Sequence, residues 1–160
     1  MTISDECSAL LGAASRFGPL YANGLSNHLP MGLIALDRMG AAPADLRRFY
    51  DAESRRLEVV APASDGAAIV PAPGDAAHGD FPAYLDYFAA RFDVLGADAL
   101  LSEWLPRLMP GIGAAAFHAL IRLAYAVEAD HRAELCHALA FWSLEFAQLD
   151  LSPRTTTATI

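Results

Sequence analysis

Residues 116–126 read AFHALIRLAYA, an apolar run that is interrupted by one histidine and one arginine. The apolar residues of this run recur at the spacing of an α-helix, and the same periodicity extends over nearly the whole chain. One long interruption, the loop 59–79, is rich in Ala, Pro, Gly and Asp. The sequence therefore predicts an all-α fold, a compact helical domain of about six to seven helices with one long loop.

Helix ends are indicated by glycine, proline and capping residues. We predict helices over residues 5–17, 30–39, 43–57, 81–96, 97–108, 112–129 and 131–149. Asn27 or Ser26 is the expected N-cap of the second helix, and Asp80 and Asp130 are expected to cap the helices that follow them. Gly96 should close the helix that begins at residue 81.

The length of 160 residues fits one domain, which we place at residues 1–150. Residues 151–160 lack apolar periodicity and are expected to form a flexible tail. Hydrophobic residues make up 54% of the chain and charged residues 19%, so either the core is large or part of the surface meets another chain. The net charge is −8 and all eleven basic residues are Arg, which excludes nucleic acid as a partner and lysine-based catalysis within the chain.

The first residues of the chain are acidic, unlike a secretory signal, and no uninterrupted apolar run approaches the roughly 18 residues of a membrane span. We therefore expect a cytoplasmic protein with no membrane partner. Cys7 and Cys136 are too few and too far apart for a disulfide framework or a zinc knuckle, and we expect both to be free thiols.

Three polar residues share one face of the helix predicted at residues 112–129. At 100° per residue, His118, Arg122 and Tyr125 point in nearly one direction. Burial of such groups without partners costs roughly 2–7 kcal/mol each, so this face should meet water, a ligand, a metal or matching polar groups. Glu128 is expected to pair with Arg122 or Arg132 across a helical turn, or to reach the site.

Histidine is the commonest metal ligand in proteins and the usual proton carrier near neutral pH. His118 is therefore either a metal-binding or catalytic residue or a hydrogen-bonded core histidine. His28 lies beside Asn27 where the chain enters a helix, and it either faces a cavity or is the solvated ring of a capping segment. His131 and His137 are six residues apart, on opposite sides of a helix, and we expect both at the surface.

Aromatic residues recur along the helix predicted from residue 81, at Phe81, Tyr84, Phe88 and Phe92. They form one continuous stripe, which suits either the wall of a pocket for a flat aromatic substrate or an ordinary helical core. Core packing is the favoured interpretation because aromatic residues dominate such cores.

Several stretches occur together and in order: NHLPM (27–31), ALDRMGA (35–41), LMPG (108–111), AAAFHALIRLAYAVE (114–128) and ALAFW (138–142). In these stretches the chain resembles the N-terminal part of the questin oxidase-like family. The resemblance implies an oxidoreductase of secondary metabolism, of monooxygenase or dioxygenase type. Its reaction would be an iron- and oxygen-dependent, Baeyer–Villiger-like ring cleavage of a small aromatic polyketide such as an anthraquinone.

The same resemblance assigns roles to residues of this chain. His28 and His118 would bind a non-haem Fe(II), and Arg122 and Tyr125 would be catalytic, the first steadying an enolate or phenolate oxygen and the second donating a proton. Asn27 and Glu128 would lie in the surrounding shell or face the substrate. The resemblance leaves open whether NADPH is the reductant.

Full-length members of the family are longer, and the resemblance implies further histidine ligands and a modified lysine from a C-terminal half. This chain contains no Lys. It would then be a fragment or split subunit, a homo-oligomer or partner of a second subunit that completes the site, or a degenerate member. The alternative function is a non-catalytic helical module that binds a ligand or a partner.

Overall fold

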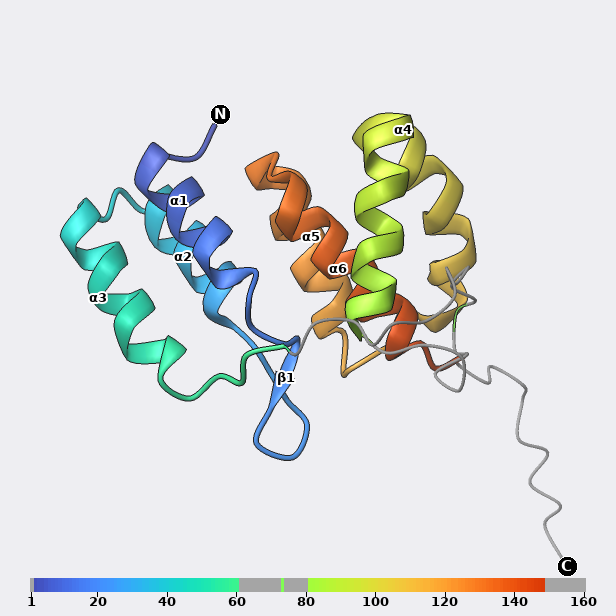
Figure 1. The fold of residues 1–160 in the computed structure, drawn as a ribbon, viewed down its shortest axis with the longest axis horizontal. Helices are drawn as coiled ribbons and strands as arrows, with labels where there is room; N and C mark the ends of the chain where they lie inside the picture. The colour runs from blue at the N-terminus through green and yellow to red at the C-terminus, as the bar shows by residue number, and fades with distance from the viewer. Residues whose placement is uncertain (1, 61–72, 74–80, 149–160) are drawn as a thin grey trace, which may run out of the picture.

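The structure, a computed structural model, describes residues 2–60, 73 and 81–148. These residues form six α-helices, a short 3-10 helix and one two-stranded hairpin, which confirms the predicted all-α class (Figure 1). The elements are α1 (Asp5–Ala14), β1 (Leu20–Tyr21), β2 (Leu25–Ser26), α2 (Leu29–Arg38), α3 (Pro43–Ser54), α4 (Phe81–Leu108), η1 (Met109–Gly111), α5 (His118–Ala129) and α6 (Arg132–Leu144). Most of the predicted loop 59–79, the expected cap Asp80 and the predicted tail 151–160 lie outside the described residues.

The helices form two groups, each with its own buried apolar cluster (Figure 1). The α1–α3 cluster includes Leu11, Leu33 and Leu46. The α4–α6 cluster is larger and includes Trp104 and Phe141. Helix α5 contributes buried residues to both clusters, so it joins the two groups.

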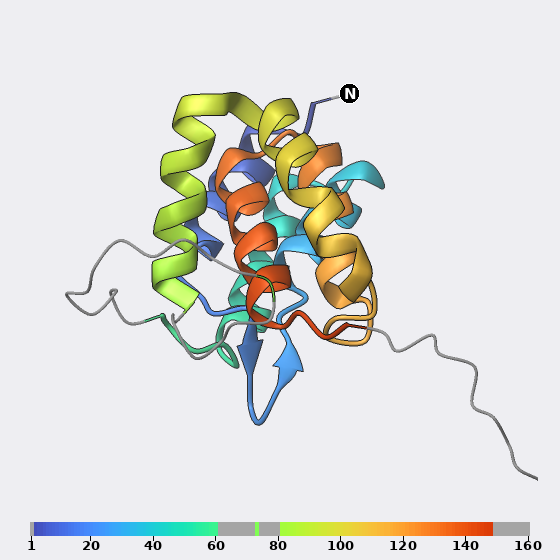
Figure 2. The same ribbon diagram turned by 90° about the vertical axis from the view of Figure 1, so that its right-hand side faces the viewer.

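Helix α4 is sharply kinked at Gly96, whose φ of 75° lies in the left-handed region that favours glycine. The sequence prediction that one helix ends at Gly96 and another follows is therefore confirmed. The two halves of α4 lie on either side of α6 (Figure 2). Tyr84 and Phe88 are almost completely buried in the α4–α6 cluster, so the aromatic stripe serves as core.

The hairpin was not predicted from the sequence. Its strands are antiparallel, with Leu20 opposite Ser26, and Asn23 and Gly24 turn the chain at positive φ values of 66° and 100°. The hairpin projects from one end of the helical body (Figures 1 and 2). The second strand leads directly into Asn27, His28 and helix α2.

Several predicted helix ends are wrong. Helix α5 begins at His118 rather than at residue 112, because residues 115–117 have left-handed backbone angles that no α-helix contains. The N-cap of α6 is His131, whose Nδ1 accepts from the backbone N–H of Glu134, whereas Asp130 ends α5 with a left-handed conformation. Helices α1, α3 and α6 also end three to five residues before their predicted limits, at residues 14, 54 and 144.

The predicted N-cap of α2, Asn27 or Ser26, is wrong, because His28 is the N-cap and Leu29 is the first helical residue. None of the helices within the described residues is long and apolar enough to cross a membrane.

Candidate functional site

Helices α2 and α5 lie side by side and run in the same direction. At their starts, the rings of His28 and His118 are in contact. At their ends, the Arg38 guanidinium donates to the backbone carbonyl of Glu128 at 3.0 Å and pairs with the Glu128 carboxylate at 2.9 Å. This parallel arrangement brings together the two histidines that the sequence singled out.

The two imidazole rings meet edge to face. Their centroids are 4.9 Å apart and their planes are inclined by 79°. The His28 side chain is exposed and the His118 side chain is half-buried, so the pair lies at the surface of the molecule.

The hydrogen bond made by His118 fixes which of its nitrogens is free. Nδ1 lies 2.7 Å from the carbonyl oxygen of Ala115, and a carbonyl can only accept, so Nδ1 carries the hydrogen. In the neutral ring, Nε2 then has an unprotonated lone pair. Metal-binding histidines characteristically donate their other ring N–H to a carbonyl or carboxylate in this way.

The backbone before His118 is strained. Ala115, Ala116 and Phe117 have φ values of 47°, 52° and 69°, in the left-handed region that costs a non-glycine residue roughly 1–2 kcal/mol. This turn precedes α5 directly and carries the Ala115 carbonyl that accepts from the His118 ring. Strain of this kind concentrates at functional sites, where the fold maintains it against its cost.

Asn27 holds the backbone on either side of His28. It is 1% exposed, its side-chain N–H donates to the Gly18 carbonyl at 2.9 Å, and its Oδ1 accepts from the Leu29 N–H at 3.0 Å. Both ends of the amide are thus engaged with the backbone. Asn27 lies behind the histidine pair, as a support of His28.

Arg122 forms a buried ion pair with Glu134 of α6. Both side chains are 1% exposed, and the Arg122 Nε and Nη2 atoms lie 2.5 and 3.1 Å from the two carboxylate oxygens. The expected pairing of Glu128 with Arg122 or Arg132 is wrong, since Glu128 pairs with Arg38. The reason is that α6 covers this face of α5 and supplies a carboxylate from a different helix.

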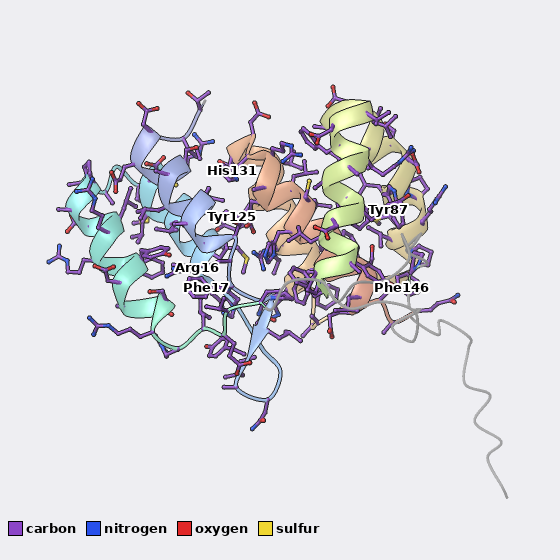
Figure 3. The ribbon with its side chains drawn as sticks, viewed as in Figure 1. Arg16, Phe17, Tyr87, Tyr125, His131 and Phe146 are labelled. Carbon is purple, nitrogen blue, oxygen red and sulfur yellow. The ribbon has the colours of Figure 1, made fainter. Side chains whose placement is uncertain are left out.

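Tyr125 lies further along α5 and is half-buried, with its ring against the α1–α3 cluster (Figure 3). Of the predicted site residues, the structure therefore brings His28 and His118 into contact and sets Asn27 behind them. Arg122 is engaged inside the fold, and Glu128 lies at the opposite ends of α2 and α5.

The prediction that His137 lies at the surface is wrong. The side chain is completely buried, its Nε2 lies 3.2 Å from the Ser15 carbonyl, and its ring is 4.6 Å from that of Phe81. Burial and the positive charge of Arg122 lower the pKa of His137 well below its usual value. The ring is therefore neutral, with the hydrogen on Nε2. His131, which was also expected at the surface, is half-buried and is the N-cap of α6.

The histidine pair alone is too small a ligand set for a metal ion. Among the described residues, no group of three or more His, Cys, Asp or Glu side chains is placed to hold a metal ion. Cys7 and Cys136 are buried free thiols, as predicted, and burial raises their pKa values to about 12 and about 11. The two imidazoles could supply at most two ligands, so a metal held here would need further ligands from elsewhere.

The family of the chain was established by comparison with known proteins. No curated protein and no solved structure matches the chain. The model of one family, Questin oxidase-like, matches residues 25–158, and both His28 and His118 lie within the matched region. The matched region covers most of the sequence, and this chain belongs to the questin oxidase-like family.

Proposed function

We propose that the chain is part of an iron-dependent oxidoreductase that cleaves a ring of an aromatic polyketide, and that His28 and His118 bind the iron. The observation that carries this proposal is the contact between two imidazoles from distant parts of the sequence, at 4.9 Å between ring centroids. Membership of the questin oxidase-like family supports an oxidoreductase-type function.

The surroundings of His118 support a metal-binding role. The Ala115 carbonyl fixes the hydrogen on Nδ1 and leaves Nε2 as the ligating atom. The strained turn at residues 115–117 fixes that carbonyl in place. When bound, a non-haem iron would supply the redox chemistry with dioxygen, while the protein orients the substrate and excludes water.

The remaining ligands come, in this proposal, from a second copy or a second subunit. Phe117 and Ile121, close to His118 in the sequence, are 52% and 43% exposed, and in this proposal the partner covers these two apolar side chains. A partner placed there would enclose the histidine pair in an apolar pocket suited to a flat aromatic substrate.

Metal analysis tests the proposal. Protein purified without chelator and loaded anaerobically with Fe(II) should retain iron after desalting. The variants His28→Ala and His118→Ala should bind it at least tenfold more weakly, since even loss of an outer-shell partner costs roughly 10–100-fold. His131→Asn is the matched control, because it removes a histidine outside the pair and keeps a capping side chain on α6.

Two outcomes would refute the proposal. Wild-type protein that binds no iron, alone or as an oligomer, would favour the rival function of a non-catalytic helical module. Equal iron binding by wild type and both alanine variants would place the metal elsewhere. Oxygen uptake with a reduced anthraquinone, measured with and without NADPH, then tests the reaction itself.

A further inference from the structure

His137 contacts the segment of chain that leads from α1 to the hairpin. Its Nε2–H donates to the Ser15 carbonyl at 3.2 Å. The backbone of Phe17 also lies near enough to raise the pKa of the ring. On its other side the ring lies against Phe81, with centroids 4.6 Å apart. Figure 3 labels Arg16 and Phe17 at the end of α1, where this segment begins. Residues 15–17 therefore contact a buried histidine of α6.

The segment is also held along one edge by residues 58–60. Gly18 N–H donates to the Glu58 carbonyl at 3.0 Å, and Val60 N–H donates to the Arg16 carbonyl at 2.9 Å. These bonds make residues 15–19 a firmly held piece of backbone. The position of residues 15–19 is therefore set by the bond from His137 together with the bonds to residues 58–60.

Asn27 is hydrogen-bonded to the C-terminal end of the same segment, at residues 18 and 19. Its backbone N–H donates to the Pro19 carbonyl at 2.8 Å, and its side chain donates to the Gly18 carbonyl at 2.9 Å. Its Oδ1 then accepts from Leu29 N–H at 3.0 Å. His28 is the residue between Asn27 and Leu29, so its backbone is fixed on both sides by one amide group.

We infer that His137 is a positioning residue for His28, acting through residues 15–19 and Asn27. The link consists of the hydrogen bond from His137 to Ser15, the backbone of residues 15–19, and the hydrogen bonds from Asn27 to Gly18 and Pro19. The inference that His137 places the His28 ring rests on these contacts alone. Its consequence for metal affinity rests on the proposed function.

The test compares two core substitutions on α6. His137→Leu removes the bond to Ser15, whereas Leu139→Ala removes packing at an equally buried position. Ring ¹⁵N and ¹H signals of His28, recorded without metal, should shift in His137→Leu and stay unchanged in Leu139→Ala. His137→Gln, whose amide can donate to the same carbonyl, should restore the wild-type signals. Iron affinity should fall at least tenfold in His137→Leu and less than threefold in Leu139→Ala.

The reciprocal variant keeps the test decisive if His137→Leu does not fold. Asn27→Ala should shift the ring signals of His137, since the same bonds connect the two residues. Unchanged His28 signals in folded His137→Leu, or equal shifts in Leu139→Ala, would overturn the inference. So would unchanged His137 signals in Asn27→Ala. A wild type that binds no iron would refute the proposed function and leave the metal-free NMR comparison valid.

Discussion

The burial of His137 makes stability depend on pH in a predictable direction. Its pKa in the folded protein lies well below the ordinary value of 6.5. As the pH falls below 6.5, the unfolded chain binds a proton at this residue and the native state does not. The contribution of His137 to the free energy of unfolding is therefore fully present above pH 6.5. It is lost as the pH falls from 6.5 toward the pKa of His137 in the folded protein.

The size of the effect follows from this difference in proton binding. Between pH 7 and pH 5.5, the free energy of unfolding falls by about 1.3 kcal/mol, because His137 stays neutral in the native state whereas the same histidine in the unfolded chain titrates near 6.5. The groups that surround the ring strengthen the effect, because the Arg122 guanidinium opposes a second positive charge. Its partner Glu134 is already engaged in the ion pair.

Urea unfolding at a series of pH values measures this loss. The comparison is with His137→Gln, which cannot titrate in this range and can still donate to the Ser15 carbonyl. Burial raises the pKa of Glu145, which acts in the opposite sense on acidification, but this contribution is common to both proteins and cancels. Parallel stability curves for wild type and His137→Gln between pH 7 and 5.5 would refute the reasoning.

Two further predictions concern residues near the histidine pair. Arg122→Met or Glu134→Leu alone should destabilise the protein by about 3–5 kcal/mol, because each leaves a buried charge unpaired, and the double variant should be more stable than either single one. Chemical denaturation measures this, and strictly additive losses would show that the two residues are not coupled. Ala116→Gly should raise stability by about 0.5–1 kcal/mol by relieving the left-handed backbone, while a looser turn weakens metal binding at His118. A lower melting temperature would contradict that account.

The helical class and most helix positions could be predicted from the sequence, because they depend on local spacing and on chain-stopping residues. Gly96 is an example, since a helix end there needs only a residue that adopts positive φ without cost. The hairpin was missed because strands of two residues are too short to show alternation. The dipeptide Asn23-Gly24 was the available signal.

The sequence suggested that His28 and His118 could lie together, but it could not predict the contact between their rings. Sequence spacing puts a residue on a helix face, whereas the contact depends on how α2 packs against α5. The left-handed run at residues 115–117 gives no signal, because alanine and phenylalanine do not favour it. These two features are tertiary, and local pattern cannot determine them.

The error about His137 has a specific cause. Reasoning from helical faces assumes that one side of a helix meets solvent. Helix α6 has ten buried residues in a run, from Glu134 to Ser143, because neighbouring helices cover it on all sides along that stretch. On such a helix a histidine is buried whichever way it points, and the same burial hides the partner of Arg122 from a sequence-based search.

The histidine pair lies at the seam where the α1–α3 cluster meets the α4–α6 cluster. His28 begins a helix whose buried side chains belong to the α1–α3 cluster, whereas those next to His118, at Ala119 and Leu123, belong to the α4–α6 cluster. Partial opening of a protein commonly proceeds in cooperative units that coincide with its structural motifs. An opening between the two clusters would move the two rings apart, so an ion bound by both rings would stabilise the closed arrangement. Amide exchange at the seam should slow on metal addition more than exchange inside either cluster.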